Sequence, residues 1–240
     1  MKVAAVREKQ TGEWYERYYT TKGDDRSDAL RNPGVLFQNL AFEKSIVEAL
    51  RRLPGDKRSW KILDVGCGAG FSMLRLLSHG LEPERLYGID IEQSRIDRGL
   101  RRFPALNLLH GDASDMDFES NSFDLAMEST MFVQLTDEPM AQGIADEMLR
   151  VVKPGRYIML TDWRYSFGRP GYRALSRTRI ANLFGVGTRS SVVCRRHGAL
   201  IPLLGRALSQ YASSLYFPLC KLLAPLVGQV TVILQKSKTQ

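Results

Sequence analysis

Three glycines at alternate positions, Gly66, Gly68 and Gly70, form the most informative stretch of the chain. They follow ILDV, a short apolar segment that predicts a buried strand. Glycine lets the backbone turn sharply and approach a ligand closely. A helix that begins behind them would point its free N–H groups and its positive dipole end at the same place. The stretch therefore predicts a ligand-binding loop between a strand and a helix.

The loop departs from the dinucleotide fingerprint G-x-G-x-x-G, because Phe71 stands where the third glycine would be. This counts against a nicotinamide or flavin nucleotide. Asp90 lies about 20 residues further on, at the end of the apolar segment YGID, where an acid can accept hydrogen bonds from both ribose hydroxyls. It could instead cap the helix predicted after it. Next to the glycine loop, the ribose role is favoured.

Two further acidic motifs fall at the ends of predicted strands. In GDASDMDF, Asp112 can accept from the exocyclic amine of an adenine, although Gly-Asp alone would only mark a turn. The segment FDLAMES ends in Glu128 and Ser129. The carboxyl ends of parallel strands meet at one edge of a sheet, so these side chains are expected around one crevice.

The elements that must position these residues alternate along the chain. Strands are predicted at WKILDV, RLYGIDI, LNLLHGD, FDLAMES and KPGRYIMLTDW, with helices at GFSMLRLLSHG, SRIDRGLRRF and DEPMAQGIADEMLRVV. Strands that alternate with helices favour an α/β fold with a doubly wound parallel sheet. Nearer the C-terminus, RSSVVCRR and GQVTVILQK predict two more strands.

The motifs LDVGCGAG, GIDIE, GDASDMDF, FDLAMES and LRVVKPGRYIMLTDW occur in the order and spacing of class I S-adenosylmethionine-dependent methyltransferases. The chain resembles this family over about residues 40–165, most of all the broad group that methylates small molecules, lipids and glycans. The resemblance implies a Rossmann-like sheet of seven strands with the last strand antiparallel. It also implies S-adenosylmethionine as cofactor and assigns no metal.

The resemblance also places the cofactor along these motifs. The methionine end would be held by Asp64, Gly66, Cys67 and Gly68, the ribose by Asp90, the adenine by Ile91, Asp112 and Ala113, and the sulfonium end by Glu128 and Ser129. In related enzymes an N-terminal helix often folds over the cofactor, so Tyr15 or Tyr19 is expected as a lid residue. Aromatic faces stabilise a nearby cation. Packing of these rings on the sheet is the alternative.

Methyl transfer from S-adenosylmethionine mainly requires that the acceptor atom is aligned with the S–CH3 bond, and a hydroxyl acceptor also needs a base. Many family members carry a histidine just after the fourth strand, but here Gln134 stands there and cannot accept a proton at neutral pH. Glu128 and Asp162 are candidates, because burial at strand ends can raise a carboxyl pKa. Hydrogen bonding to loop backbone is their alternative role. His197 is the third candidate.

We expect residues 1–58 to form an N-terminal helical cap and residues 59–240 the methyltransferase domain, with a helical insertion at about 198–227. The insertion is largely apolar and much longer than a hairpin, and loops that long are usually functional. It could roof the acceptor pocket, form a homodimer interface, rest as a peripheral element on a membrane, or extend the core.

Composition and charge bear on the possible binding partners and on the cellular compartment. The net charge is +8, and arginines crowd the final third of the chain, at 164, 169, 173, 177, 179, 189, 195 and 196. Such a patch can meet nucleic acid, an anionic membrane or a phosphorylated substrate, or can simply be a solvated face. Aromatic residues are not interleaved with it, which disfavours nucleic acid. Three scattered cysteines without a CxxC pair predict neither disulfides nor a zinc site, and favour the reducing cytoplasm.

The sequence therefore predicts methyl transfer from S-adenosylmethionine to a small-molecule acceptor, with a hydroxyl of a sugar or secondary metabolite preferred. A small amine, and so N-methylation, is the second possibility. A non-catalytic S-adenosylmethionine-binding protein and a nucleic-acid methyltransferase are the alternatives from other classes. Against the latter, no Asn/Asp-Pro-Pro-aromatic motif follows the fourth predicted strand.

Overall fold

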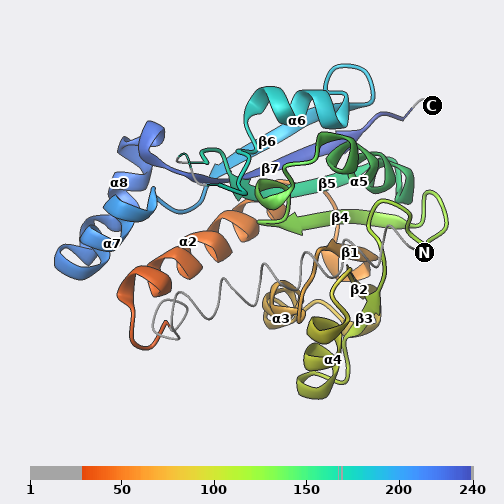
Figure 1. The fold of residues 1–240 in the computed structure, drawn as a ribbon, viewed down its shortest axis with the longest axis horizontal. Helices are drawn as coiled ribbons and strands as arrows, with labels where there is room; N and C mark the ends of the chain where they lie inside the picture. The colour runs from red at the N-terminus through yellow and green to blue at the C-terminus, as the bar shows by residue number, and fades with distance from the viewer. Residues whose placement is uncertain (1–28, 167, 169, 239–240) are drawn as a thin grey trace.

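The computed structural model describes residues 29–166, 168 and 170–238. Its centre is one seven-stranded sheet in the order β3-β2-β1-β4-β5-β7-β6 (Figure 1). The strands are β1 (Ile62–Val65), β2 (Leu86–Asp90), β3 (Asn107–His110), β4 (Phe123–Ser129), β5 (Val152–Trp163), β6 (Ser190–His197) and β7 (Gln229–Lys236). Tyr15 and Tyr19 lie outside the described residues.

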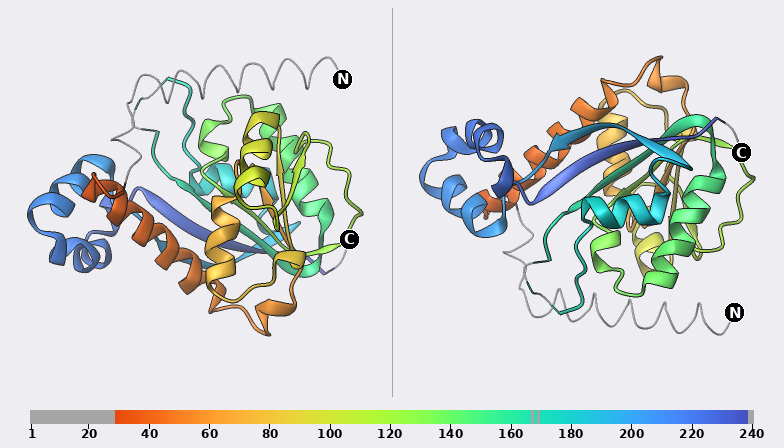
Figure 2. Two further views of the ribbon diagram at one scale, coloured as in Figure 1. Left: turned by 90° about the horizontal axis from the view of Figure 1, so that it is seen from below. Right: turned by 90° about the horizontal axis from the view of Figure 1, so that it is seen from above.

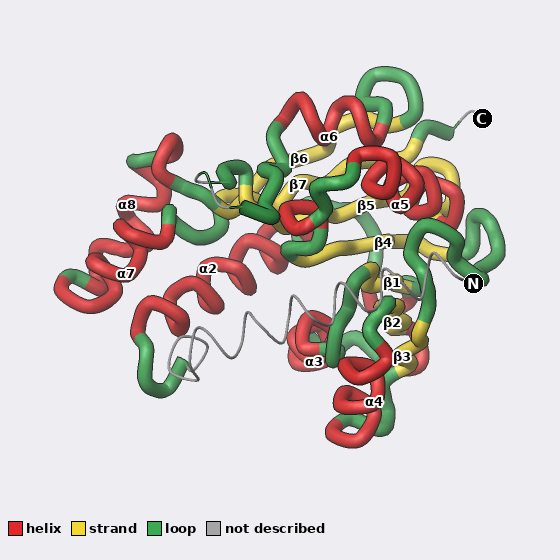
Figure 3. Tube along the Cα trace, viewed as in Figure 1, coloured by secondary structure: helices red, strands yellow, loops and turns green. Residues whose placement is uncertain are grey.

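The pairing of the strands confirms the Rossmann-like, doubly wound fold. Strands β3, β2, β1, β4 and β5 are parallel, whereas β7 runs antiparallel to both of its neighbours. The last strand is thus wedged between β5 and β6. The first five strands end at one edge of the sheet, and most of the loops that follow them gather there (Figure 3).

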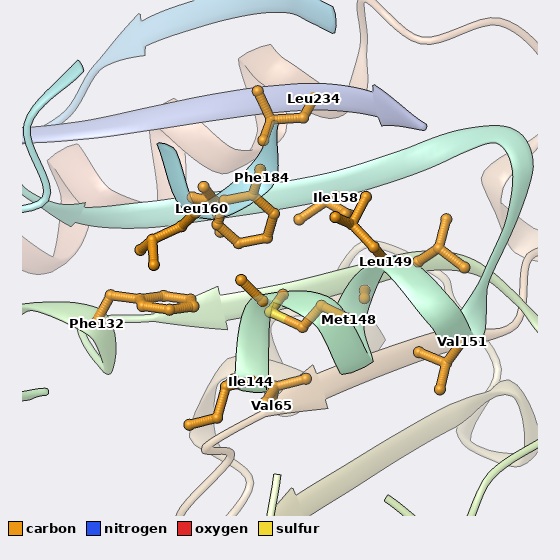
Figure 4. Close-up of a cluster of buried hydrophobic side chains, with 14 of the residues drawn as sticks. Val65, Phe132, Ile144, Met148, Leu149, Val151, Ile158, Leu160, Phe184 and Leu234 are labelled. Carbon is orange, nitrogen blue, oxygen red and sulfur yellow. The ribbon is translucent and has the colours of Figure 1, made fainter. Parts of the chain in front are cut away.

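Helices cover both faces of the sheet (Figures 1 and 2). One face carries α2 (Pro33–Leu50), α3 (Phe71–Ser78) and α4 (Gln93–Arg102), and the other carries α5 (Glu138–Val151) and α6 (Arg177–Phe184). Each face has its own hydrophobic cluster. Figure 4 shows the second of these, where Ile144, Met148 and Phe184 pack against Ile158 and Leu160 of β5.

Local signals set the helix boundaries that the sequence predicts. Asp137 is the N-cap of α5, and its carboxylate accepts from the Met140 N–H at 3.1 Å. Asn32 caps α2 by accepting from Gly34 N–H at 3.0 Å, and a proline follows each cap within the first turn. Helix α6 ends at Gly185, whose φ of 55° favours glycine.

The segment between β6 and β7 folds into two short helices, α7 (Pro202–Tyr211) and α8 (Tyr216–Leu222), with 3-10 turns η5 (Ser213–Leu215) and η6 (Ala224–Leu226). We name residues 202–226 the α7–α8 lobe. It projects from one end of the molecule (Figures 1 and 2) and packs on α2 through Ala41, Tyr216 and Cys220. Helix α2 also bonds to the sheet, since Ser45 Oγ lies 2.8 Å from Thr231 Oγ1. The division of the chain at residues 58 and 59 stays a prediction.

Candidate active site

A cavity of about 340 Å³ opens at the carboxyl edge of the sheet, beside the ends of β1, β2 and β4. We call it the cofactor cavity. Its walls bring together residues that lie far apart in the sequence. Six residues that the sequence assigned to the cofactor line it, namely Gly66, Asp90, Ile91, Asp112, Ala113 and Ser129. The other lining residues include Arg95, Thr130, Met131, Gln134, Leu135, Met140 and Ile144.

The glycine loop is held against β2 by two backbone bonds, from Gly66 N and Cys67 N to Ile89 O at 2.8 and 3.1 Å. Gly66 and Gly68 have φ values of 72° and 56°, which residues with a side chain rarely adopt. A Cβ at Gly66 would lie 2.8 Å from the sulfur of Met131. Cys67 is buried with its thiol towards Gly88, and neither Cys67 nor Gly68 is among the residues that line the cavity.

Asp90 is not the N-cap of α4, since Glu92 holds that position, and its ribose role stays a prediction. Its carboxylate accepts from Gly68 N at 2.8 Å and from Glu92 N at 2.9 Å, which ties the glycine loop to the start of α4. Arg95 Nη1 lies 3.6 Å from the same carboxylate. Asp90 also lines the cavity. Because an ionised carboxylate has about four acceptor sites, it keeps capacity for a ligand hydroxyl.

Arg95 is a site residue that sequence reasoning missed. It projects from the first turn of α4, and its guanidinium lies so close over Gly68 that an added Cβ there would collide with it. It therefore covers the glycine loop and pairs with Asp90. Nothing in the motif QSRIDRGL distinguishes this arginine from its solvent-exposed neighbours, because the outcome depends on the path of one long side chain.

Asp64 lies under the loop as a buried acid without a partner. It is 1% exposed, and neither carboxylate oxygen has a hydrogen-bond partner. Burial raises the pKa of this carboxyl from 3.8 to about 8, Asp90 adds to the rise, and Arg95 opposes it. A buried polar group without a partner destabilises the fold. A cation placed beside it would supply the missing interaction, so the residue fits a ligand with an ammonium group.

Glu128 and Asp162 lie together behind the cavity rather than in it. Glu128 Oε2 accepts from Met131 N at 3.0 Å, and Asp162 Oδ2 accepts from Val133 N at 2.7 Å. Burial raises the pKa of Glu128 well above its ordinary value, and that of Asp162 to about 7. Both carboxyls thus hold the backbone that follows β4, which is the alternative role stated for them above. Their catalytic role stays a prediction.

The segment after β4 is fixed from the other side by Arg179, which therefore does not belong to a solvated basic face. Arg179 is only 6% exposed. Its guanidinium donates to Phe132 O at 2.8 Å and Leu135 O at 2.6 Å, and it pairs with Glu138 at 2.9 Å. Within the segment, Thr130 has a φ of 60°. A β-branched residue there carries backbone strain, which is common at ligand sites.

On the β3 side of the cavity, Asp112 forms a turn. Its Oδ1 accepts from Ser114 N at 2.8 Å and from Ser114 Oγ at 2.7 Å. Ala113 follows it in the cavity wall, opposite Ile91 from the end of β2. The two residues expected at the adenine edge therefore lie where β3 ends, as the motif GDASDMDF indicates.

His197 is not brought to this site. It is exposed at the end of β6 and lines a second cavity of about 270 Å³ between α2, β6 and α8. That cavity shares no lining residue with the cofactor cavity. The two cavities are separate because β7 lies between β5 and β6 in the sheet.

Residues 62–155 match the family model of a methyltransferase domain. By this match the chain contains a methyltransferase domain, and its sheet has the fold of S-adenosylmethionine-dependent methyltransferases. The matched range of this methyltransferase domain includes the glycine loop, Asp90, Asp112 and the segment after β4. The α7–α8 lobe lies outside it.

Curated relatives of the domain are demethylmenaquinone methyltransferases. The protein of Bacillus mycoides is 29% identical over 139 residues, and that of Bacillus cereus 30% over the same length. Each alignment covers 56% of this chain and 56% of the relative. The chain thus spans about half the length of the curated relatives it matches.

Solved structures share the fold at low sequence identity. A protein of Pyrococcus horikoshii is 15% identical with a TM-score of 0.61, over 93% of this chain and 98% of that one. A methyltransferase of Methanosarcina mazei is 22% identical with a TM-score of 0.57, over 79% and 97%. Geranyl diphosphate C-methyltransferase of Streptomyces coelicolor is 15% identical with a TM-score of 0.57, over 80% and 77%. At these identities the likeness concerns the fold alone.

Proposed function

We propose that the protein binds S-adenosylmethionine in the cofactor cavity and transfers its methyl group to a small-molecule acceptor. The observation that carries the proposal is Asp64, a buried acid with two unpartnered oxygens directly under the glycine loop. The methionine end of the cofactor carries an ammonium group. Placed beside Asp64, this cation would stabilise the ionised carboxylate that burial now disfavours.

The remaining cofactor contacts follow from the walls of the cavity. Gly66 would bind the rest of the methionine end, and the backbone of Cys67 and Gly68 could join it once Arg95 leaves the loop. Asp90 would accept from the ribose hydroxyls, and Arg95 would have to move off the glycine loop to admit the ligand. The adenine would lie along Ile91, with Asp112 and Ala113 at its edge and Ser129 near the sulfonium.

The cofactor supplies an activated methyl group, so the chain has to align the acceptor and exclude water. Apolar side chains of the segment after β4 and of α5 contribute to that exclusion, among them Met131, Leu135 and Met140. Among the described lining residues the ionisable groups are Asp90, Arg95 and Asp112, all on the cofactor side. The described lining therefore shows no further ionisable group that could act as a base for the acceptor.

A described lining without such a base favours acceptors that react without a base from the protein. Acidic hydroxyls, such as phenols or enols, and electron-rich ring carbons meet this condition. The names of the relatives, demethylmenaquinone methyltransferase and geranyl diphosphate C-methyltransferase, also refer to acceptors with apolar carbon skeletons. We therefore place an acceptor of this kind first. The hydroxyl of a sugar is the second candidate and would need a base from outside the described lining.

The first test is calorimetry with S-adenosylmethionine and S-adenosylhomocysteine, on the wild type and on Asp90→Ala. We expect binding by the wild type and at least a tenfold loss in the variant, because two hydroxyl contacts and the Gly68 brace disappear. No binding to the folded wild type would refute the proposal.

The second test is turnover, followed as S-adenosylhomocysteine formed, with phenolic, quinol, amine and sugar acceptors. Turnover with phenols or quinols and not with sugars supports the assignment. Binding of the cofactor without turnover on any class would favour the non-catalytic alternative.

A further inference from the structure

The charge of the chain is divided sharply at the end of β5, because no acidic residue follows Asp162. The part beyond it contains α6, β6, the α7–α8 lobe and β7, and every charged residue there is Lys or Arg. Some of these cations are neutralised by acids from α5, such as Arg179 by Glu138 and Arg189 by Asp146. Among the described residues, the two cations of the lobe, Arg206 and Lys221, form no such ion pair.

The second cavity, of about 270 Å³, collects cations at the base of the lobe. Lys44 of α2, Arg196 and His197 of β6, and Lys221 of α8 line it, and Glu48 is the single acid among its walls. Glu48 is already paired with Lys44 at 2.5 Å. Among the described residues, neither Arg196 nor Lys221 forms an ion pair. Two cations without an ion-pair partner among the described residues therefore line one hollow.

The floor of this cavity is apolar, formed in part by Ala41, Phe217 and Cys220. A compact anion such as phosphate accepts charge-assisted hydrogen bonds from Lys and Arg. A hollow with cations at its rim and carbon on its floor suits a phosphate that is attached to an apolar body.

The outer surface of the lobe exposes large apolar side chains at helical spacing. On α7, Leu203 and Tyr211 are 84% and 81% exposed, and on α8 Leu222 is 76% exposed. Leu215 and Leu226 add to this surface. The positions 203, 207 and 211 repeat every four residues and so form one stripe along α7. No helix of the described residues is long and apolar enough to cross a membrane. Short helices with such stripes can instead lie in the plane of an interface.

We propose that the α7–α8 lobe docks on an anionic lipid surface, with the second cavity binding the phosphate of a lipid headgroup. The apolar stripes would enter the boundary between headgroups and acyl chains while Arg196 and Lys221 meet phosphate. Charge complementarity selects this occupant over a second copy of the chain. A symmetric contact through the lobe would bring two identical cationic surfaces together, and like charges disfavour it.

The lobe and the cofactor cavity are physically connected. After β5, Tyr165 Oη donates to Pro225 O of the lobe at 2.8 Å, and Arg173 N donates to Val133 O at 2.7 Å. Val133 belongs to the segment that borders the cofactor cavity. The stretch after β5 therefore contacts both the lobe and the segment that borders the cofactor cavity. The docking itself does not depend on methyl transfer.

The test is sedimentation of the full-length protein with vesicles of phosphatidylcholine, with and without about one third phosphatidylglycerol. The cavity variant is Arg196→Gln/Lys221→Gln. Its control is Arg98→Gln/Arg101→Gln, which removes the same charge from the exposed face of α4 beside β3, at the opposite end of the sheet order. The apolar variant is Leu203→Ser/Leu222→Ser, with Leu109→Ser on β3 as its control.

We expect binding to the anionic vesicles, weakened about fivefold for each cavity charge removed and about 25-fold in the double variant. The controls should bind within about twofold of the wild type, and raised salt should weaken binding. The apolar variant should lose binding at unchanged charge. Circular dichroism and thermal unfolding of each variant separate loss of binding from loss of fold, since all substituted side chains are at least partly exposed.

Several results would overturn the proposal. One is equal binding to neutral and anionic vesicles, and another is equal loss in the cavity variant and its charge-matched control. A third is a dimer in the absence of lipid that Leu203→Ser/Leu222→Ser dissolves. The last experiment adds inorganic phosphate and follows the thermal unfolding of the protein. A rise in the unfolding temperature that Arg196→Gln/Lys221→Gln removes, without any binding to vesicles, would assign the cavity to a free phosphate ligand instead of a headgroup.

Discussion

Binding of the cofactor should release a proton from Asp64, and this makes the affinity depend on pH in a predictable way. In the empty protein the pKa of Asp64 is about 8, so at pH 7 only about a tenth of the molecules carry the carboxylate. The ammonium of the ligand favours the ionised form and lowers that pKa in the complex. Binding at pH 7 therefore releases nearly one proton.

The sign of the dependence follows from the same shift. Affinity for S-adenosylhomocysteine should rise by about ninefold from pH 6 to pH 7, because the empty protein holds its proton below pH 8 and the complex does not. Above pH 8 the rise should level off, because Asp64 is then ionised in the empty protein as well. The affinity should fall only at higher pH, where the α-amino group of the ligand loses its own proton.

Calorimetry measures both quantities. Titrations at pH 7 in two buffers with different ionisation enthalpies give the number of protons released, and titrations at pH 6, 7 and 8 give the slope. Asp64→Asn should bind more weakly and lose most of the slope between pH 6 and 7; any slope left would report Asp162 or Glu128. A wild-type affinity that is flat from pH 6 to 7, with no proton released, would refute the role given to Asp64.

Three further predictions concern stability and the loop. Asp64→Asn should stabilise the empty protein relative to the wild type, and the gain should grow by up to about 4 kcal/mol between pH 5 and pH 8. The reason is that the unfolded chain ionises Asp64 near pH 3.8 and the folded protein only near pH 8, so the wild type loses stability over that range. Thermal unfolding at both pH values checks this. Arg179→Leu should lower the free energy of unfolding by about 3 kcal/mol, because it leaves the carbonyls of Phe132 and Leu135 without donors. Its control, Arg177→Leu on the exposed side of α6, should change that free energy by less than about 0.5 kcal/mol. Urea unfolding measures both. Gly68→Ala should lower stability by about 1 kcal/mol and weaken binding of S-adenosylhomocysteine at least tenfold. Gly80 also has a positive φ, but only Arg58 lies near it. Gly80→Ala should therefore lower stability by a similar amount and leave binding unchanged.

The sequence is informative about the sheet because its strands are short and buried. Apolar segments such as ILDV and FDLAMES can be recognised without neighbours, and the glycines between β1 and α3 mark the turn. The cofactor-side residues share one simple property, since Asp90, Asp112 and Ser129 lie at or directly after the ends of parallel strands. Topology alone then brings them to one edge, and the cavity contains all three.

What the sequence does not reveal depends on distant packing. Arg179 belongs to a stretch of arginines that looks solvated, and only the fold shows that its guanidinium is buried against the backbone after β4. Arg95 covers the glycine loop because of its side-chain conformation, which no spacing encodes. His197 lies at a strand end like the others, but its strand β6 is separated from β5 by β7. Strand order, rather than strand identity, decides its distance from the cofactor cavity.

The position of β7 also constrains how the chain can fold. β5 and β6 are not neighbours in the sheet, and the strand that joins them is the last one, Gln229–Lys236. During synthesis on the ribosome, β5 and β6 emerge before their shared partner, and the whole apolar segment of residues 202–226 emerges in between. The edges of β5 and β6 that pair with β7 therefore stay open, and the lobe stays exposed, until β7 has been synthesised. Open edges of this kind template unwanted pairing between chains. Loss of β7 should therefore lead to aggregation of the nascent protein rather than to a smaller folded sheet.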